Sequence, residues 1–172
     1  EDLSRGLGDV YKRQLLNGMA HYEILDKEFG KEKIFGGTAY ISTAMNNYGS
    51  IQQITSRASI KFGPRTQKNI SIANKFYEIC KETEFECDFS DHIELDLWRK
   101  YVLIGATAAS TVLFQKPLGE ICATTYGKSL IIEIHEECKK IVLSKGYDIG
   151  IEATNYNFCL LYTSDAADDS LR

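Results

Sequence analysis

The chain has 172 residues, with 20 lysines and arginines against 24 aspartates and glutamates, a net charge of −4, and 44% hydrophobic residues. This composition is typical of one globular domain or two small ones, which can bury a core without disulfides or metals. The weak negative charge excludes the basic footprint of nucleic-acid or anionic-membrane binding. No uncharged run reaches the roughly 20 residues that a membrane span needs.

The cysteines and histidines form no recognisable metal or disulfide pattern. No Cys-x-x-Cys pair occurs among the five cysteines, and no signal peptide precedes them, which together indicate a reducing, cytoplasmic compartment. His135 is followed by Glu136, but no second histidine follows four residues after it, so the zinc motif of metalloproteases is absent. We therefore expect no metal site.

Both ends of the chain have the sequence of translated DNA adapters. Ser4 to Gln14 (SRGLGDVYKRQ) and Cys159 to Asp169 (CLLYTSDAADD) correspond, in opposite orientations, to the transposase adapters used to prepare sequencing libraries. We therefore expect residues 1–14 and 159–172 to be non-native, and residues 15–158 to be the biological segment. The glycines near residue 7 and the aspartates near residue 168 are for this reason not interpreted as functional motifs.

The first part of this segment, in chain order, has a mixed α/β pattern. Met19 to Phe29 has the spacing of a short helix. Short β-rich runs follow between glycine and asparagine residues and predict strands at residues 34–42, 50–54 and 58–62. Thr66 is placed to cap a helix whose apolar positions extend to Cys80, and residues 85–89 predict one more short strand.

After Ser90 the β signal ends and helices follow. Ser90 or Asp91 is a suitable N-cap for a long helix that runs to Gln115, with Glu94 at the capping-box position. From Tyr101 onward this helix is apolar or small on all sides, so we expect that half to be buried. Pro117 begins a further helical stretch, and a second long helix ends at Gly146. We place a domain boundary near residue 90.

Two residues stand out as candidates for chemistry. Lys100 lies where the amphipathic half of the long helix becomes apolar, and it either extends its stem along the helix to reach water or donates a proton to a substrate oxygen from a desolvated site. Asn17, before Gly18, either belongs to an ordinary turn or faces a ligand beyond the carboxyl end of a strand. The residues alone leave both alternatives open.

A longer set of strings resembles the ketopantoate reductase (2-dehydropantoate 2-reductase) family. These strings are LLNGM, IFGGTAYIS, IKFG and LWRKYVLIGATAASTVLFQKPLGEI, and they occur in the same order over nearly all of residues 15–158. The resemblance implies the C-terminal part of a Rossmann-type NADP(H)-binding domain over residues 15–90, followed by the start of an α-helical substrate and dimerisation domain over residues 91–158. It also implies that the Gly-x-Gly-x-x-Gly phosphate turn lies upstream, so that the chain itself is expected to be inactive.

The resemblance also assigns roles to residues. Lys100 matches the catalytic lysine that donates a proton to the keto oxygen, and Asn17 matches the asparagine at the nicotinamide. The family typically carries substrate-binding asparagines one and two turns after the lysine, where this chain has Ile104 and Ala108. Thr107 and Thr111, on the same helical face as Lys100, are the substrate-binding candidates in their place.

Three functional hypotheses follow. The first is an NADPH-dependent 2-oxo-acid reductase of pantothenate biosynthesis. Under this hypothesis the protein binds a small-molecule substrate, can form a homodimer, and binds neither nucleic acid nor a membrane. The second is a related two-domain hydroxy-acid dehydrogenase with another substrate. The third is a non-enzymatic helical module for binding or dimerisation, in which Lys100 only extends to water.

Overall fold

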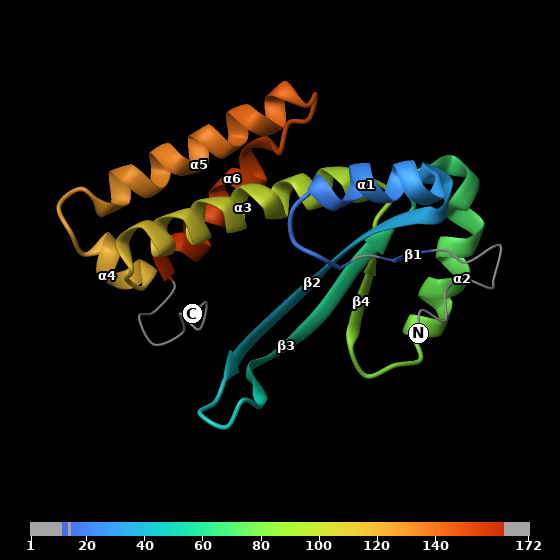
Figure 1. Ribbon diagram of the computed structural model, residues 1–172, viewed down its shortest axis with the longest axis horizontal. Helices are drawn as coiled ribbons and strands as arrows, with labels where there is room; N and C mark the ends of the chain where they lie inside the picture. The colour runs from blue at the N-terminus through green and yellow to red at the C-terminus, as the bar shows by residue number, and fades with distance from the viewer. Residues whose placement is uncertain (1–11, 14, 164–172) are drawn as a thin grey trace. The chain divides into compact units, whose positions relative to one another are not determined.

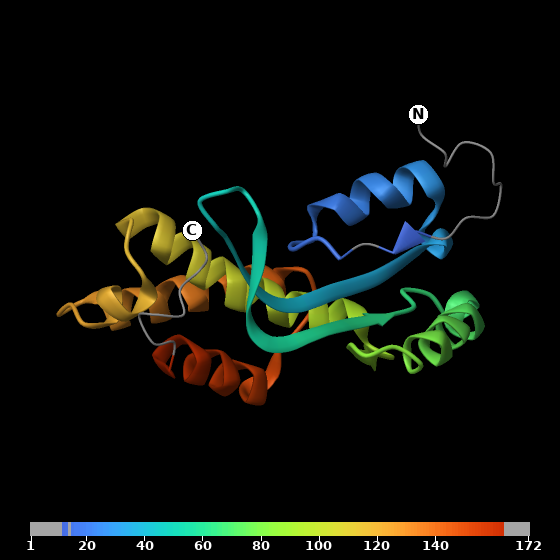
Figure 2. The ribbon, with the colours of Figure 1, turned by 90° about the horizontal axis from the view of Figure 1, so that it is seen from below.

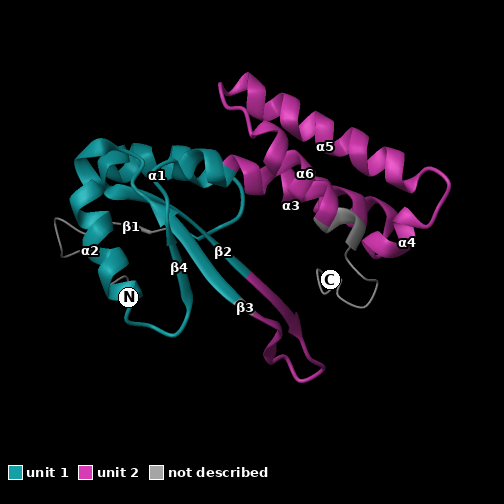
Figure 3. Cartoon of the chain, turned by 180° about the vertical axis from the view of Figure 1, so that it is seen from behind, with its two compact units in different colours: residues 1–40, 58–97 teal, residues 41–57, 98–172 magenta. Residues whose placement is uncertain are grey.

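The computed structural model of the chain describes residues 12–13 and 15–163 (Figure 1). It divides into two compact units, of which unit 1 comprises residues 1–40 and 58–97 and unit 2 comprises residues 41–57 and 98–172 (Figure 3). Most of the two predicted adapter segments, namely residues 1–11, 14 and 164–172, lies outside the described residues. The division falls between Leu97 and Trp98, and the functional domain boundary near residue 90 stays a prediction.

Strands and helices alternate through the first part of the chain, and only helices follow. The strands are β1 (Lys12–Arg13), β2 (Ile34–Met45), β3 (Ile51–Gly63) and β4 (Glu86–Phe89), in the spatial order β1-β2-β3-β4. β1 is parallel to β2 and β3 is parallel to β4, whereas β2 and β3 are joined by a short turn and run antiparallel. This mixed sheet with helices, followed by a helical segment, confirms the predicted fold class.

The second and third predicted strands are one strand in the structure. β3 is continuous from Ile51 to Gly63, although residues 55–57 lack the apolar character of the flanking runs. β2 and β3 lie side by side in both views (Figures 1 and 2). Hydrogen bonding to β2 therefore keeps the polar residues extended, which is a tertiary effect that local propensity does not contain.

A tight turn joins β2 to β3. The side-chain Oδ1 of Asn46 accepts hydrogen bonds from the backbone N–H groups of Tyr48 and Ser50, both at 3.0 Å. Gly49 has a φ of 79°, a left-handed conformation that favours glycine. The asparagine and the glycine together direct the chain back along β2.

The core of unit 1 occupies both faces of the sheet, because successive strand residues point in opposite directions. On one face, β2 packs against α1 (Ala20–Phe29) and the beginning of α3 (Ile93–Phe114) through Tyr22, Ile34, Ile93 and Leu97. On the other face, β2 and β3 pack against α2 (Ile70–Cys80) through Phe35, Phe62, Ala73 and Cys80. Gly63 is required between these layers, since a Cβ there would lie 1.9 Å from the carbonyl oxygen of Ser90.

The helix starts follow the predicted signals only in part. Thr66 was expected to cap α2, but a 3-10 turn at Gln67–Asn69 comes first and the Thr66 side chain makes no capping hydrogen bond. Asn69 instead precedes α2 and donates to the carbonyl oxygen of Glu32. Before α3, the Ser90 hydroxyl accepts from the N–H of His92 and donates to Asp96, which supports the predicted helix start.

Unit 2 contains the rest of α3 together with α4 (Leu118–Cys122), α5 (Gly127–Ser144) and α6 (Gly150–Thr163). A cluster of Leu118, Ile121 and Ile131, with Phe158 packed against it, joins α4, α5 and α6. Among the described residues, no helix is long and apolar enough to cross a bilayer.

The second half of α3 is less buried than its composition predicts. Val102, Ala106 and Ser110 are fully buried, but Val112 and Leu113 are 68% and 67% exposed. α5 approaches α3 from one side, where a Cβ on Gly105 would lie 3.1 Å from the Cys138 sulfur. The expectation of burial on all sides was wrong for the described part of the chain, because its helices cover only one face of this segment.

Arg65 joins three elements of unit 1. Its Nη1 and Nη2 donate to Asp26 of α1 at 2.5 and 2.8 Å, and its Nε donates to Glu94 of α3 at 3.0 Å. The guanidinium lies 4.3 Å from the centroid of the Tyr22 ring, and the side chain is only 6% exposed. A planar group with several fixed donors suits this forked arrangement, which lysine cannot reproduce.

We predict that Arg65→Ala lowers the free energy of unfolding by about 2–4 kcal/mol, because Asp26 and Glu94 lose their partner in a poorly hydrated site. Urea unfolding followed by circular dichroism measures the change. Lys81→Ala is the matched control, since the Lys81–Glu78 pair is exposed and is expected to contribute little to stability. Equal unfolding midpoints for the two variants would contradict the prediction.

Candidate functional site

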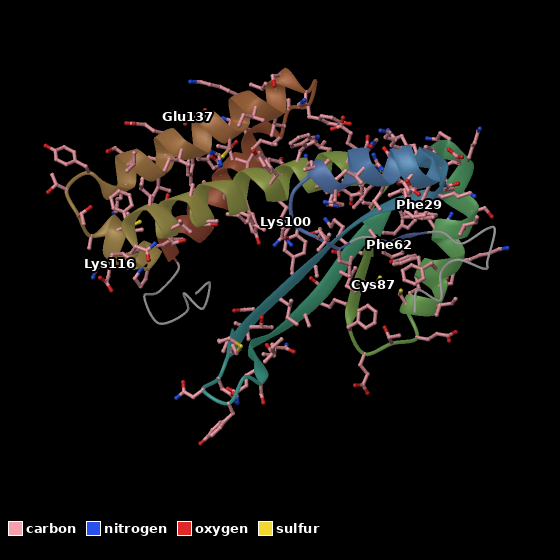
Figure 4. All side chains as sticks on the ribbon, in the orientation of Figure 1. Phe29, Phe62, Cys87, Lys100, Lys116 and Glu137 are labelled. Atoms are coloured by element: carbon pink, nitrogen blue, oxygen red, sulfur yellow. The ribbon has the colours of Figure 1, made fainter. Side chains whose placement is uncertain are left out.

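Lys100 lies on a well-anchored part of α3. The neighbouring Trp98 is buried and contacts the rings of Tyr101 and Tyr147, with centroid distances of 5.3 and 6.0 Å. Arg99 Nε donates to the carbonyl oxygen of Ile149 at 3.2 Å, and Val102 is fully buried. These contacts hold the backbone that carries Lys100, which Figure 4 labels on this helix.

The side chain of Lys100 is half-buried, and this burial lowers its pKa to about 8. Desolvation has this effect because it disfavours the charged ammonium relative to the neutral amine. A lysine with a pKa near the operating pH can both carry a positive charge and release a proton. The site therefore suits a group that gains negative charge during a reaction, such as a carbonyl oxygen that becomes an alkoxide.

Thr107 and Thr111 follow Lys100 on the same face of α3, but their hydroxyl protons are used within the helix. Thr107 Oγ1 lies 3.1 and 3.0 Å from the carbonyl oxygens of Leu103 and Ile104. Thr111 Oγ1 lies 3.1 and 3.2 Å from those of Thr107 and Ala108. A hydroxyl has a single proton, so in this arrangement each threonine can accept a hydrogen bond from a ligand but not donate one.

Asn17 lies in unit 1, in the bend that leads to α1. Its side chain is exposed, and Gly18 has a φ of 84° with open space where a Cβ would stand. The carboxamide is therefore accessible to a ligand. The structure thus brings Lys100, Thr107 and Thr111 together on one helix of unit 2, while Asn17 belongs to unit 1.

The structure adds a buried polar pair that the sequence did not suggest. His135 of α5 is fully buried, and its Nε2 lies 3.2 Å from Asn157 Nδ2 of α6. Its Nδ1 has no hydrogen-bond partner, and burial lowers the pKa of this histidine. His135 falls on the apolar stripe of α5 with Ile131 and Cys138, and that position was the available signal for burial. Among the described residues, no group of three or more potential ligands could hold a metal ion.

Comparison with known proteins identifies relatives of the chain. Residues 14–67 match the family model described as ketopantoate reductase PanE/ApbA. Over 113 residues the chain is 38% identical to the uncharacterised oxidoreductase YkpB of Bacillus subtilis (strain 168), a match that covers 66% of this chain and 37% of YkpB.

Solved structures share the fold over most of the chain. A ternary structure of D-mandelate dehydrogenase with NADH and anilino(oxo)acetate matches with a TM-score of 0.81 and 18% identity, over 95% of this chain and 53% of that one. The 2-dehydropantoate 2-reductase from Geobacter metallireducens GS-15 matches with a TM-score of 0.77 and 19% identity, over 88% and 51% of the two chains. The chain therefore spans about half the length of these two proteins.

YkpB is named as an oxidoreductase, and the two solved structures are of a dehydrogenase and a reductase. The family match lies at residues 14–67, and the structural matches extend the likeness through the helical unit. Residues 14–67 therefore match the ketopantoate reductase family, and over the rest of the chain the likeness to the solved structures shows a shared fold.

Proposed function

We propose that the complete protein containing this chain reduces a 2-oxo acid to a 2-hydroxy acid with a nicotinamide cofactor. The observation that carries the proposal is the half-buried Lys100, whose pKa burial lowers to about 8. The names of the two structurally similar proteins support it, since mandelate is a 2-hydroxy acid and 2-dehydropantoate is a 2-oxo acid. Because the chain spans about half of those proteins, we expect the 172-residue chain itself to be inactive.

The family resemblance assigns Asn17 to the nicotinamide end of the cofactor. The accessible carboxamide of Asn17, beside the open backbone of Gly18, can hydrogen-bond to that end, and residues 15–90 would form part of the cofactor domain. We propose NADP(H) from the family resemblance, although the D-mandelate dehydrogenase structure names NADH. A cytoplasmic location and a homodimer belong to the same proposal, whereas a role in pantothenate biosynthesis would require 2-dehydropantoate as the substrate.

The proposed chemistry divides between cofactor and protein. The bound cofactor would supply a hydride to the carbonyl carbon of the substrate. The Nζ of Lys100 donates a hydrogen bond to the keto oxygen and transfers its proton as the C=O bond becomes a C–O single bond. Lys100 then regains a proton from water, so that one hydride and one proton are consumed for each 2-hydroxy acid formed. Residues 91–158 would provide the substrate side of the reaction.

We predict that Lys100→Ala in the complete protein lowers kcat/KM by about 10²–10⁴-fold while the Kd of the cofactor is unchanged, because only proton donation is lost. For the unmodified protein, kcat/KM falls as the pH rises through about 8, since Lys100 then loses its proton. Steady-state kinetics and cofactor titration measure both effects. Normal turnover by Lys100→Ala would exclude Lys100 as the proton donor, whereas no turnover by the unmodified complete protein would favour the non-enzymatic helical module.

The same burial predicts a stability effect that the 172-residue chain can test. An exposed lysine titrates near 10.5, so the unfolded state binds more protons between about pH 8 and 10.5, and stability rises with pH over that interval. Below pH 8 the folded chain carries the full penalty of a buried charge. Lys100→Met should therefore raise the urea midpoint at pH 7, and its advantage should shrink as the pH approaches 10.5.

The control for this experiment is Lys116→Met, because Lys116 is exposed and pairs with Glu120 at 2.7 Å. No increase in the urea midpoint is expected for the control. An unchanged or lower midpoint for Lys100→Met at pH 7 would show that Lys100 is hydrated in the folded chain.

We predict that Asn17→Ala raises the Kd of the nicotinamide cofactor for the complete protein roughly three- to tenfold, the effect of one lost hydrogen bond. Titration of cofactor fluorescence measures the Kd. Asn74→Ala is the matched control, because Asn74 is an exposed asparagine on α2. Equal Kd values for the two variants would assign Asn17 to an ordinary turn.

A further inference from the structure

The face of α3 that follows Lys100 carries no further charge. Residues 101–114 contain no acidic or basic side chain. Ile104 is half-buried one turn after Lys100, and Ala108 is exposed two turns after it. At 1.5 Å per residue these positions lie about 6 Å and about 12 Å along the helix axis from Lys100. A ligand whose reacting group lies at Lys100, and whose other end follows this face of α3, would therefore meet an apolar and then a small side chain.

The hydroxyls on this face do not change its character. Thr107 is 8% exposed, and both of its short contacts are to backbone carbonyls of its own helix. Thr111 likewise contacts the carbonyls of Thr107 and Ala108. A ligand hydroxyl would find no hydrogen-bond donor among these side chains, and its best acceptor would be Thr111, three turns from Lys100.

We infer that the substrate is a 2-oxo acid whose side chain beyond the keto group is apolar and lacks a hydroxyl. This inference rests on the proposed function, because it takes Lys100 as the group at the keto oxygen. Its physical reason is that a hydroxyl placed against Ile104 loses its hydrogen bonds to water without gaining a partner, whereas a methyl group or ring in the same place is buried favourably.

Two substrates that differ by a single oxygen test this inference in the complete protein. 2-Dehydropantoate carries a hydroxymethyl group where 3,3-dimethyl-2-oxobutanoate carries a methyl group, and the two are otherwise identical. We expect kcat/KM to be about 10–100-fold higher for the compound without the hydroxyl, the range that an apolar pocket achieves against an added hydroxyl. A site built to bind the hydroxyl would instead reject the deoxy compound by about 10⁴-fold or more.

A variant tests whether this face of α3 meets the substrate. Ile104→Asn introduces an amide that can donate to and accept from a hydroxyl, and it should shift the ratio of the two kcat/KM values at least fivefold toward 2-dehydropantoate. Ile104→Val keeps the position apolar and should change the ratio less than twofold. An unchanged ratio in Ile104→Asn would overturn the assignment of this face.

The outcomes separate the two levels of the proposal. A protein that reduces both acids but prefers 2-dehydropantoate overturns the inference and leaves the reductase function intact. A protein that reduces neither acid, and whose cofactor oxidation does not depend on Lys100, overturns the proposed function and the inference together.

Discussion

The ion pairs of the buried Arg65 guanidinium with Asp26 and Glu94 connect the elements of unit 1. Arg65 follows directly after Gly63 and Pro64, where β3 ends, and it connects the sheet to Asp26 of α1 and Glu94 of α3. Lys31 also pairs with Glu94, at 3.1 Å, so two positive groups face two negative ones. Arg65 is the most buried member of this network, so its removal would leave Asp26 and Glu94 without the partner that replaces their water.

The same network explains why the start of α3 is so well defined. Ile93 and Leu97 pack into the sheet core, and Gly63 allows the chain near Ser90 to pass directly against β3. Apolar contact holds one side of this first turn, and the ion pair with Arg65 holds another. Gly63 is necessary as well, because a residue with a Cβ would clash with the Ser90 carbonyl oxygen.

Lys100, in unit 2, is a second partly buried cation. Its side chain is half-buried, and burial is the cause of its lowered pKa. A chain selected only for stability would place an apolar residue at this point of α3, since the charged form is penalised there. Strongly perturbed groups of this kind are typical of functional sites. The stability given up at Lys100 and the acid strength gained there have the same physical origin.

The sequence by itself predicted the mixture of strands and helices up to Phe89, the two long helices that follow and the start of α3 near Ser90, because these depend on periodicity and turn residues; it did not predict β1 or α6. The residues alone made Lys100 one candidate, and the family resemblance made it the leading one. Only the tertiary structure decided the continuity of β3, since pairing with β2 overrides the polar residues 55–57. It also decided the burial of His135 and the exposure of Val112, because burial depends on which helices cover which face. Likewise, the lowered pKa of Lys100 follows from desolvation by burial, which no local sequence pattern records.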